Sequence, residues 1–589
     1  MITTPRPEYP RPILTRPDWL NLNGEWRFAV DRENRGLKEK WFGSDLPGNQ
    51  RIRVPYPINS SASGVSEEHG EPVVWYQREF TVPPDWCEHR LCLRIGASDY
   101  HTMVMLNGHR VGEHSGGYSP FVIDIQDFLQ DGANVLTVRV QDSLSWTQPR
   151  GKQAGTTRWP VDYDGVTGIW QTVWLEPLPE TSIESICTEF NLSTSTLKCH
   201  VDFSQQVEGE LTVELFNGDD PVVIASTTTG LRAEGRLELT IPDPILWSPA
   251  QPHLYDLRVT LVPVTGEPDR VASYCGLREI AIDDGCLKLN GEPLYLRGVL
   301  DQGYFPEGWY TALDDAALKR DVELTLALGF NCTRKHQKAE DPRYLYWADR
   351  LGLLVWAEMP SGRIFSTELV QALTKEWLEL VKRDRGHPSV MAWVPFNESW
   401  GVWHQSIRPA QRAFVEGIVG LTRALDTSRP VVGNDGWEYS AGDLWTLHVY
   451  EEGGDLETRI GELIGDPGSL VVPNQEGSGG RAGALHGAVV AGLPILLTEC
   501  GGIGFGSHGE DDFSYGDLPD TEAELETRIR QSLAAITAAD SLQGYVWTQL
   551  TDVQQEINGL LYFDREPKLP IETLRGLFGE NPAFRQSGN

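Results

Sequence analysis

The sequence predicts a multidomain protein of mixed β and α/β class, in which two β-sandwiches precede a (β/α)8 barrel. The first observation is length, because 589 residues exceed what one hydrophobic core usually supports and favour roughly two to four domains. The second is that apolar residues alternate with a period of two up to about residue 279, as in half-buried strands. The third is that strand-like apolar runs alternate with amphipathic helices from about residue 280, which is typical of α/β folds.

Residues 1–178 are predicted to form a jelly-roll-like β-sandwich that resembles a sugar-binding domain. Leu91, Leu93 and Ile95 alternate along the stretch RLCLRIGAS. The pair Asn107-Gly108 separates two strand-like runs and favours a tight hairpin turn. The stretch NVLTVRVQD continues the alternation, so this region is expected to be rich in strands.

Residues 179–279 are predicted to form a second, immunoglobulin-like β-sandwich. Short strand patterns surround another Asn-Gly pair in LTVELFNGDDPVVIAS. The stretch LYDLRVTLV keeps Tyr255, Leu257, Val259 and Leu261 in register on one face. The size of this region, roughly a hundred residues, suits an immunoglobulin-like domain.

Residues 280–589 are predicted to form the barrel, with eight candidate strands as a closed barrel requires. They are LYLRGVL, FNCTRKH, LLVWAEM, VMAWVPFNE, PVVGND, LWTLHVY, PILLTEC and GYVWTQL. A helix is expected to open with a Thr311 to Asp314 capping pattern, and another to place Leu369, Leu373 and Trp377 on one face. Two Gly-rich stretches, 466–492 and 501–517, are interpreted as binding loops or lids, with surface disorder as the alternative.

The net charge of the chain indicates which classes of partner it disfavours. The chain has 84 acidic against 50 basic residues, a formal net charge of −34. Such a surface repels nucleic acid and anionic membranes, so neutral partners are favoured over both. The stretch MITTPRPEYPRPILTRPDW lacks the apolar core of a signal peptide, and no run of about 18 apolar residues occurs. We therefore expect a cytoplasmic location.

The cysteines and tryptophans add two further expectations. The eight cysteines form no CxxC pair and have no clustered His partner, so neither a zinc site nor a disulfide framework is predicted. We expect reduced, mostly buried thiols. The twenty tryptophans often lie in polar, loop-like stretches, where an indole ring can pack in the core or stack on the apolar face of a sugar.

Polar residues end most of the predicted barrel strands, and a (β/α)8 barrel holds its active site at the carboxyl ends of its strands. In strand order the terminal residues are Arg297, Asp301 and Gln302; Arg334, Lys335 and His336; Glu358; Asn397 and Glu398; Asn434 and Asp435; His448 and Tyr450; Glu499; and Trp547. We expect these side chains to surround one pocket.

Two glutamates stand out, because Glu398 and Glu499 each end a long apolar run. Glycoside hydrolysis needs such a pair, in which one carboxyl protonates the leaving oxygen and the other attacks the anomeric carbon. Strands four and seven face each other across the ring, which suits the roughly 5–5.5 Å separation of retaining enzymes. The alternative is structural pairing with an arginine or helix capping, a role favoured for Glu358 beside Arg334. Spacing alone leaves both interpretations of Glu398 and Glu499 open.

Seven ordered sequence blocks resemble those of glycoside hydrolase family 2, the family of β-galactosidases, β-glucuronidases and β-mannosidases. They are WLNLNGEWRFAVD, DGVTGIWQTVWLEP, LNGEPLYLRGV, ALGFNCTRKH, YWADRLGLLVWAE, HPSVMAWVPFNES and LLTECGG. The resemblance covers essentially the whole chain. It implies a sandwich, an immunoglobulin-like domain and a catalytic (β/α)8 (TIM) barrel. This agrees with the fold class predicted from the periodicity of the apolar residues.

The resemblance also implies roles for individual residues. Glu398, in the Asn-Glu pair, matches the acid/base, and Glu499, in TECGG, matches the nucleophile. Asn397 matches the amide that hydrogen-bonds the sugar 2-hydroxyl, a bond that strengthens in an oxocarbenium-like transition state. Tyr450 is similar to the tyrosine that orients the nucleophile, with His448 close by.

Further substrate-binding residues follow from the same resemblance. Arg334 resembles the arginine beneath the nucleophile, and Trp547 the tryptophan that forms a wall of the sugar subsite. His336 lies near the substrate histidine of the family, although RKH is one residue shorter than the usual Arg-x-x-His. Asp162 or Asp164 matches the acidic residue that the first domain contributes to the subsite.

Departures from the family pattern bear on the substrate and on metals. The Asn-x-Lys clamp that holds the carboxylate in β-glucuronidases is replaced by Glu556, Ile557 and Asn558. A glutamate facing a uronate repels it by about 1–4 kcal/mol at 4 Å, so glucuronidase activity is disfavoured unless Lys335 or Arg363 supplies another clamp.

The loops after the first and third strands also depart from the pattern of the metal-dependent β-galactosidases. The loop after the first strand is replaced, and Asp301 with Gln302 would suit sugar hydroxyls. Glu358 is present without the nearby His that helps to ligate magnesium in those enzymes, so no metal and no cofactor are predicted.

The sequence thus predicts a retaining exo-β-glycosidase acting on terminal neutral sugars, with β-galactosidase as the first specificity. The alternatives are a β-glucuronidase or β-galacturonidase, an α-L-arabinofuranosidase or arabinopyranosidase, and a non-catalytic carbohydrate-binding protein. The expected partner is an oligosaccharide or glycoside. A homo-oligomer is possible from the resemblance, and a monomer is equally compatible with the sequence.

Overall fold

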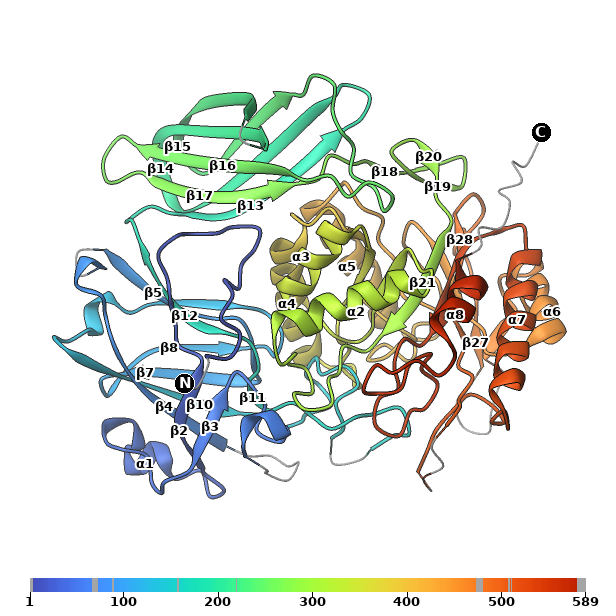
Figure 1. Ribbon diagram of the computed structural model, residues 1–589, viewed down its shortest axis with the longest axis horizontal. Coiled ribbons are helices and arrows are strands. Elements are labelled where there is room, and N and C mark those ends of the chain that lie inside the picture. The colour runs from blue at the N-terminus through green and yellow to red at the C-terminus, as the bar shows by residue number, and fades with distance from the viewer. Residues whose placement is uncertain are drawn as a thin grey trace.

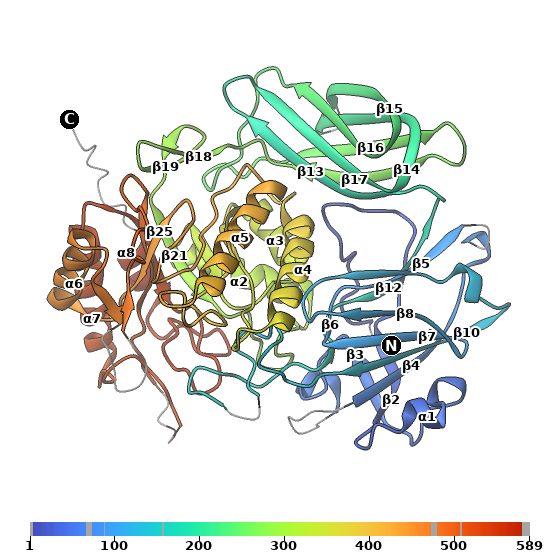
Figure 2. The same ribbon diagram turned by 180° about the vertical axis from the view of Figure 1, so that it is seen from behind.

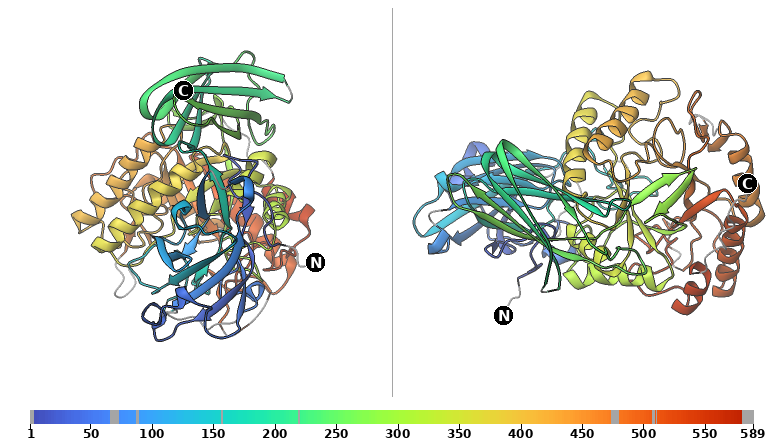
Figure 3. Two further views of the ribbon diagram at one scale, coloured as in Figure 1. Left: turned by 90° about the vertical axis from the view of Figure 1, so that its left-hand side faces the viewer. Right: turned by 90° about the horizontal axis from the view of Figure 1, so that it is seen from above.

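The computed structural model describes residues 4–65, 73–86, 89–155, 158–218, 220–472, 480–506, 509 and 511–579. Two β-sandwiches and a barrel follow one another along the chain, as the change from blue through green to red shows in Figure 1. Seen from above in Figure 3, both sandwiches lie on one side of the barrel. The predicted fold class is confirmed.

The first sandwich is built from two main antiparallel sheets. One sheet has the order β1 (Leu20–Asn21), β12 (Val173–Leu178), β5 (Arg90–Ile95) and β9 (Phe121–Asp124). The other has the order β3 (Arg51–Val54), β2 (Gly24–Val30), β4 (Val73–Thr81), β10 (Ala133–Gln141), β7 (His101–Leu106) and β8 (His109–Ser115). The short strands β6 (Ser98–Asp99) and β11 (Gly168–Ile169) pair beside them. Asn107 and Gly108 both have positive φ in the turn from β7 to β8, which confirms the predicted hairpin.

The second sandwich contains five antiparallel strands. They are β13 (Ile183–Asn191), β14 (Thr196–Asn217), β15 (Asp220–Thr240), β16 (Tyr255–Pro263) and β17 (Asp269–Cys275). The first half of β14 pairs with β13 and its second half with β16, while β15 follows it throughout. The register shifts between Asp202 and Val207, where the long strand changes partner. The predicted alternation holds, since Tyr255, Leu257, Val259 and Leu261 are all buried.

A small antiparallel sheet closes the amino-terminal end of the barrel. It consists of β18 (Ile280–Asp283), β19 (Cys286–Leu289) and β20 (Glu292–Pro293). Leu287 and Leu289 of this sheet pack in one apolar cluster with Leu296, Trp356 and Met391 at the starts of the barrel strands. The end of the barrel opposite the carboxyl ends of the strands is therefore filled with apolar side chains.

Within the described residues the barrel has seven regular parallel strands, where eight were predicted. Their order is β24 (Val390–Val394), β23 (Leu354–Glu358), β22 (Cys332–Lys335), β21 (Leu296–Asp301), β29 (Leu542–Thr548), β28 (Ile495–Gly501) and β25 (Trp445–His448). The remaining candidate, PVVGND at 430–435, makes only isolated bridges, with Val431 opposite Trp393 and Asp435 opposite Asn397. The backbone N–H of His448 donates to Gly436, so the segment still closes the ring between β24 and β25. Pro430 has no N–H for a ladder, which is one reason why a regular strand does not form here.

Helices surround the barrel, and the pattern of each predicts the face that it buries. They are α2 (Asp315–Ala327), α3 (Pro342–Leu351), α4 (Thr367–Asp384), α5 (Pro409–Leu425), α6 (Gly453–Gly465), α7 (Glu522–Ala538) and α8 (Ile571–Phe578). Leu369, Leu373 and Trp377 of α4 are buried as predicted. The cap of α2 is Asp314, whose side chain accepts from the Ala317 N–H, and not Thr311, whose hydroxyl donates to Trp170 of the first sandwich.

Short elements complete the described chain. They are α1 (Gly36–Glu39), the 3₁₀ turns Trp41–Gly43, Ser61–Ser63, Pro84–Trp86 and Gln126–Phe128, and the strands β26 (Leu470–Val472) and β27 (Arg481–Ala482). The Gly-rich stretches predicted as loops fall partly outside the described residues, at 473–479 and at 507, 508 and 510. No described helix has the length and apolar character needed to cross a bilayer. The seven described cysteines are free thiols, and Cys87 lies outside the described residues.

The first sandwich reaches the barrel through the long connection between β10 and β11, the teal loop that runs along the barrel in Figure 2. The N–H groups of Arg150 and Gly151 both donate to the Ser361 carbonyl, in the loop that follows β23. This connection therefore lies against the carboxyl ends of the strands, where the polar residues gather.

Candidate active site

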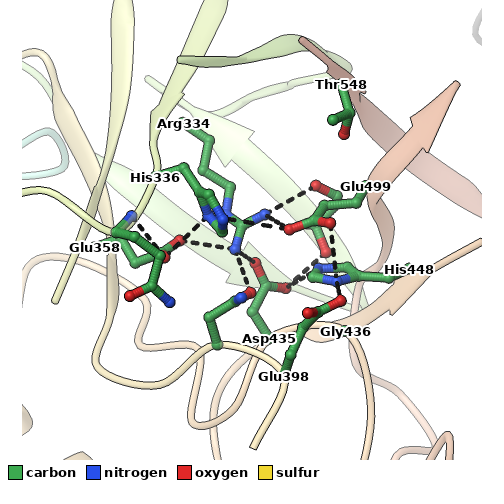
Figure 4. A network of polar contacts seen from close by, with 12 residues as sticks. Arg334, His336, Glu358, Glu398, Asp435, Gly436, His448, Glu499 and Thr548 are labelled. Carbon is green, nitrogen blue, oxygen red and sulfur yellow. Dashed lines mark hydrogen bonds and ion pairs between the residues drawn. The ribbon is translucent and has the colours of Figure 1, made fainter. Parts of the chain in front are cut away.

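The carboxyl ends of the barrel strands bring Glu398 and Glu499 together, as Figure 4 shows. One carboxylate oxygen of each glutamate and one ring nitrogen of His448 all lie within 4.8 Å of one another. Glu499 lies within β28, and Glu398 follows β24. Glu398 and Ser399 have φ of 52° and 58°, a left-handed conformation that is uncommon away from glycine. This turn aims the Glu398 carboxylate across the strand ends toward Glu499.

Glu499 is held as a carboxylate by its neighbours. Its Oε1 accepts from Arg334 Nη1 at 2.7 Å, and its Oε2 accepts from the Tyr450 hydroxyl at 2.5 Å. Burial alone would raise the pKa of this carboxyl, but the charges of His448 and Arg334 outweigh it and lower the pKa to about 2. Glu499 is therefore ionised at any physiological pH.

Glu398 lies in the opposite electrostatic environment. Burial raises the pKa of its carboxyl, and the negative charge of Glu499 raises it further, against a contribution from His448, whose Nδ1 lies 3.0 Å from Glu398 Oε1. The Glu398 side chain is 19% exposed and that of Glu499 is 4% exposed. The two carboxyls thus have pKa values pushed apart, the pattern of an acid beside a nucleophile.

Arg334 lies at the centre of the buried charges beneath the carboxylates. Its Nη2 lies 2.7 Å from Glu358 and 3.0 Å from Asp435, and donates to Asn397 Oδ1 at 2.6 Å. With Glu499 the guanidinium thus contacts three carboxylates and one amide, which fixes its fork geometry. The predicted pairing of Glu358 with Arg334 is seen in the structure.

Two histidines complete the charge pattern, and they differ in protonation. Desolvation opposes charge on His448, but Glu499 and Asp435 overcome it and raise its pKa to about 10. Burial and the neighbouring Arg334 lower the pKa of His336 well below its usual range, so this ring is neutral. His336 Nδ1 lies 3.1 Å from Glu358 and 4.0 Å from Glu499. Asp435 accepts from the Thr498 hydroxyl at 2.6 Å, a role that sequence patterns did not reveal.

Glu398, His448 and Glu499 also form a group that has the geometry to hold a metal ion. An imidazolium has no free lone pair to ligate a metal, and His448 is charged because its pKa is raised to about 10. In its protonated form His448 instead pairs with the carboxylates of Glu398 and Glu499, at 3.0 and 3.4 Å from its Nδ1.

Unpaired polar atoms mark where a ligand would bind. Asn397 Nδ2, Gln549 Nε2 and Asn558 Oδ1 are buried and have no hydrogen-bond partner among the described residues. Asn397 follows the fourth barrel strand, β24, and Gln549 and Asn558 follow the last one, β29. A sugar hydroxyl can both donate and accept, so it satisfies such atoms.

Two predicted sugar-binding residues make other contacts in the structure. Trp547 is 1% exposed, and its ring packs against Phe578 of α8, on the outer side of the strand. Because side chains alternate along a strand, the neighbouring Thr548 points inward, and its hydroxyl lies 3.2 Å from that of Tyr450. Asp301 forms a buried ion pair with Lys335 at 2.6 Å. A role of Asp301 in sugar binding, or of Lys335 in a uronate clamp, would require this ion pair to open.

The position of the expected clamp holds a buried pair contributed by two domains. Glu556 accepts from the Tyr163 hydroxyl at 2.5 Å and from Asn558 Nδ2 at 3.1 Å. Lys152 Nζ, from the first sandwich, lies 3.4 Å from Glu556 Oε2, and its charge is close enough to lower the pKa of Glu398. Sequence patterns did not identify Lys152, because its place depends on how the sandwich docks on the barrel.

The two acidic candidates of the first sandwich have different surroundings. Asp162 is buried and accepts from Arg363 Nη2 at 2.6 Å and from the Trp159 N–H at 3.0 Å. Asp164 is partly exposed, and its carboxylate lies 3.0 Å from Arg158. Of the two, Asp162 is therefore the one that is buried against the barrel, through its contact with Arg363.

Comparisons with known proteins agree in family. Sequence models described as "Glycosyl hydrolases family 2, sugar binding domain", "Glycosyl hydrolases family 2" and "Glycosyl hydrolases family 2, TIM barrel domain" match residues 20–179, 181–278 and 280–462. The chain is 30% identical over 481 residues to a β-glucuronidase of Felis catus, covering 74% of this chain and 71% of that protein. It is 28% identical over 435 residues to a β-galactosidase of Thermoanaerobacter pseudethanolicus, covering 71% and 55%.

A solved structure matches nearly the whole chain. It is a β-glucuronidase from Ruminococcus gnavus in complex with D-glucaro 1,5-lactone. The two structures have a TM-score of 0.80 at 21% sequence identity, covering 98% of this chain and 100% of the other. At this identity the likeness shows the shared fold alone.

Proposed function

The chain belongs to glycoside hydrolase family 2, and from this premise we propose that it cleaves terminal β-linked sugars by a retaining double displacement. The observation that carries the proposal is the approach of the Glu398 and Glu499 carboxylates to within 4.8 Å, with pKa values shifted in opposite directions. Retaining enzymes have carboxyls about 5–5.5 Å apart, and inverting enzymes need roughly 6.5–9.5 Å for an intervening water.

In the first step Glu499 attacks the anomeric carbon, while the Glu398 carboxyl donates its proton to the glycosidic oxygen. A C–O ester bond forms to Glu499, and the bond to the leaving group breaks with release of a neutral alcohol. Arg334 and Tyr450 hold the attacking carboxylate in place through its two oxygens. Both Arg334 and Glu499 are buried, which strengthens their electrostatic contact.

The second step needs Glu398 as a base, so the pKa of its carboxyl must fall after the first step. The charge of Glu499 is one cause of the raised pKa of Glu398. Once Glu499 is a neutral ester, that cause disappears and the pKa of Glu398 falls. Glu398 then accepts a proton from water as the water oxygen bonds to the anomeric carbon. The ester bond to Glu499 breaks at the same carbon, which frees Glu499 as a carboxylate and restores the configuration of the substrate.

Asn397 contributes to the transition state in this proposal. Arg334 fixes its Oδ1, and this leaves Nδ2 free to donate to a sugar hydroxyl. A hydrogen bond to the 2-hydroxyl strengthens as positive charge develops on the ring, so it lowers the barrier instead of only binding the substrate.

For the sugar we propose a neutral hexopyranoside, with galactose as the first choice. Lys152 and Glu556 offer one donor group and one acceptor group 3.4 Å apart in a buried wall. Such a pair matches hydroxyls, which donate and accept, whereas a uronate carboxylate would meet Glu556 as well as Lys152.

A β-glucuronide is the second candidate, and two observations favour it. The relatives named above include a β-glucuronidase of Felis catus at 30% identity. Lys152 and Arg363 also place two cations near Glu398. A uronate could displace Glu556 from Lys152 and take over its ion pair.

Two measurements test the proposal. Proton NMR of the first-formed product decides the stereochemistry, and we expect the β-anomer; an α-anomer first would contradict the retaining assignment. A panel of p-nitrophenyl glycosides, including β-galactoside, β-glucoside, β-glucuronide and α-L-arabinoside, ranks the sugars by kcat/KM. Saturable sugar binding with no product from any member would point instead to a non-catalytic binding protein.

A further inference from the structure

Four tryptophans form a cluster that we call the tryptophan rim, defined as Trp146, Trp159, Trp400 and Trp403. Trp146 and Trp159 belong to the loop of the first sandwich, and Trp400 and Trp403 follow β24 in the barrel. The ring centroid of Trp159 lies 5.9 Å from that of Trp146, 6.4 Å from that of Trp400 and 6.3 Å from that of Trp403. Trp146, Trp159 and Trp403 are only half-buried, so ring surface remains open to a ligand.

The rim lies beside the acid/base and not beside the nucleophile. Trp400 follows Glu398 by two residues, and the Arg363 guanidinium lies 3.5 Å from the Trp400 ring centroid. Glu398 is close enough to Arg363 to act on its pKa, which burial lowers to about 10. Glu398 is also the more exposed of the two carboxyls. The leaving group departs on the side of the acid/base, which is the side that the rim occupies.

Arg363 presents unused donors within the rim. Its Nη2 donates to Asp162, while Nε and Nη1 are buried without a hydrogen-bond partner among the described residues. Its guanidinium is also stacked near Trp159, at 4.4 Å from the ring centroid. Buried donors of this kind call for an acceptor, such as an oxygen on a bound ring.

Exposed apolar side chains extend the rim outward. Ile364, next to Arg363, is 50% exposed, and Ile407, in the turn after Trp403, is 73% exposed. The Ile364 N–H donates to the Trp146 carbonyl at 2.9 Å, which places this exposed side chain next to the rim.

We propose that the tryptophan rim and Arg363 form the leaving-group subsite, and that it takes a ring with an apolar face and an oxygen acceptor. This inference rests on the proposed glycosidase activity. An aromatic aglycone and the apolar face of a second sugar share this chemistry, since each offers a ring face to indole and an oxygen to Arg363. Asp162 then acts as a positioning residue, because it holds both Arg363 and the Trp159 backbone.

The mechanism separates this subsite from the sugar subsite. The leaving group is present only in the first displacement, so its contacts affect kcat/KM and not the hydrolysis of the glycosyl-enzyme. A glycosyl fluoride has no ring to place on the rim. Comparing an aryl glycoside with the fluoride of the same sugar therefore isolates the contribution of the rim.

The test uses Trp159→Ala and Trp403→Ala in the full-length protein. We expect the ratio of kcat/KM for the p-nitrophenyl glycoside to kcat/KM for the fluoride to fall about tenfold in each variant, equal to about 1.4 kcal/mol. A disaccharide with the same non-reducing sugar shows which ring source is preferred. Trp41→Ala is the matched control, because Trp41 packs against Trp75 in the first sandwich, far from the rim.

An unchanged ratio in both rim variants, with thermal unfolding like that of the wild type, would overturn the proposal. A fall in the Trp41→Ala ratio would also overturn it, since the effect would then be general. If the wild type hydrolyses neither substrate, the glycosidase proposal fails, and calorimetric titration with p-nitrophenol tests the rim alone. Loss of binding in Trp159→Ala supports the subsite, and equal binding in wild type and variant rejects it.

Discussion

The floor and the rim of the site differ in origin and in chemistry. The floor, formed by Arg334, Glu358, Asp435, His448 and Glu499, comes entirely from barrel strand ends and is buried and charged. The rim is aromatic and partly open, and it is shared between the barrel and the first sandwich. The barrel thus holds the atoms that react, whereas selection of the leaving group depends on docking of a second domain.

The difference has a physical basis. A buried charge is costly unless it is paired, so each floor residue is fixed by several ionic partners, as Arg334 is. A ring platform tolerates change, because the apolar part of its contact with a ligand is non-directional. Substitutions in the floor should therefore affect every substrate, and those in the rim only some.

The largest effect is expected for Glu499→Gln. The amide keeps the shape of the side chain but cannot attack the anomeric carbon, so kcat/KM should fall on the order of 10⁵-fold for every glycoside. Steady-state kinetics with an aryl glycoside and a glycosyl fluoride measure it. Near wild-type turnover of either substrate would remove Glu499 from the nucleophile role.

Glu398→Gln should have a smaller effect that depends on the leaving group. Loss of a general acid costs about 10²–10⁴-fold, most for poor leaving groups. The same variant should hydrolyse the glycosyl-enzyme slowly, because the base is also lost. A fall of equal size for p-nitrophenyl and alkyl glycosides would contradict proton donation by Glu398.

The pH profile of kcat/KM links these two residues. Glu398 must be protonated and Glu499 ionised in the free enzyme, so activity lies between their pKa values. The pKa of Glu499, lowered to about 2, places the acidic limb far below neutrality. The raised pKa of Glu398 places the alkaline limb above the ordinary value for a glutamate, and activity is lost as pH rises through it. An alkaline limb that persists unchanged in Glu398→Gln would assign it to another group.

The floor was largely predictable from the sequence. For the rim, the sequence indicated only that some loop tryptophans could stack on a sugar, and not which of them lie together. Glu499 and Arg334 of the floor, and Glu398 beside them, lie at the ends of apolar strands or just after them. The periodicity of the sequence locates these strands, and the family resemblance gives the residues roles. Trp547 shows the limit of that reasoning, because a shift of one residue along a strand exchanges the inner and outer faces. Lys152 and Trp159 have no such signal, since their place depends on contacts between domains.

Asn397→Ser tests whether Asn397, which Arg334 of the floor holds by its Oδ1, stabilises the transition state or only binds the sugar. Loss of the Nδ2 donor should lower kcat and kcat/KM together by about 10²-fold, because the bond to the 2-hydroxyl strengthens as charge develops. A 2-deoxy substrate offers the control, since the variant and the wild type should then differ much less. A change confined to KM would mean that Asn397 contributes uniform binding.

Lys152 links the two regions, because it belongs to the same loop as Trp146 and Trp159 of the rim and yet lies close to Glu398 and Glu556 in the barrel. Lys152→Met removes the cation 3.4 Å from Glu556, while Glu556→Gln removes the anion and keeps the shape. Charges this close interact by about 1–4 kcal/mol, so each change should shift the preference between a β-glucuronide and a β-galactoside about tenfold. Lys152→Met should disfavour the glucuronide and Glu556→Gln should favour it. If the ratio of kcat/KM values moves in the same direction in both variants, the pair does not read the charge of the sugar, and specificity lies elsewhere in the pocket.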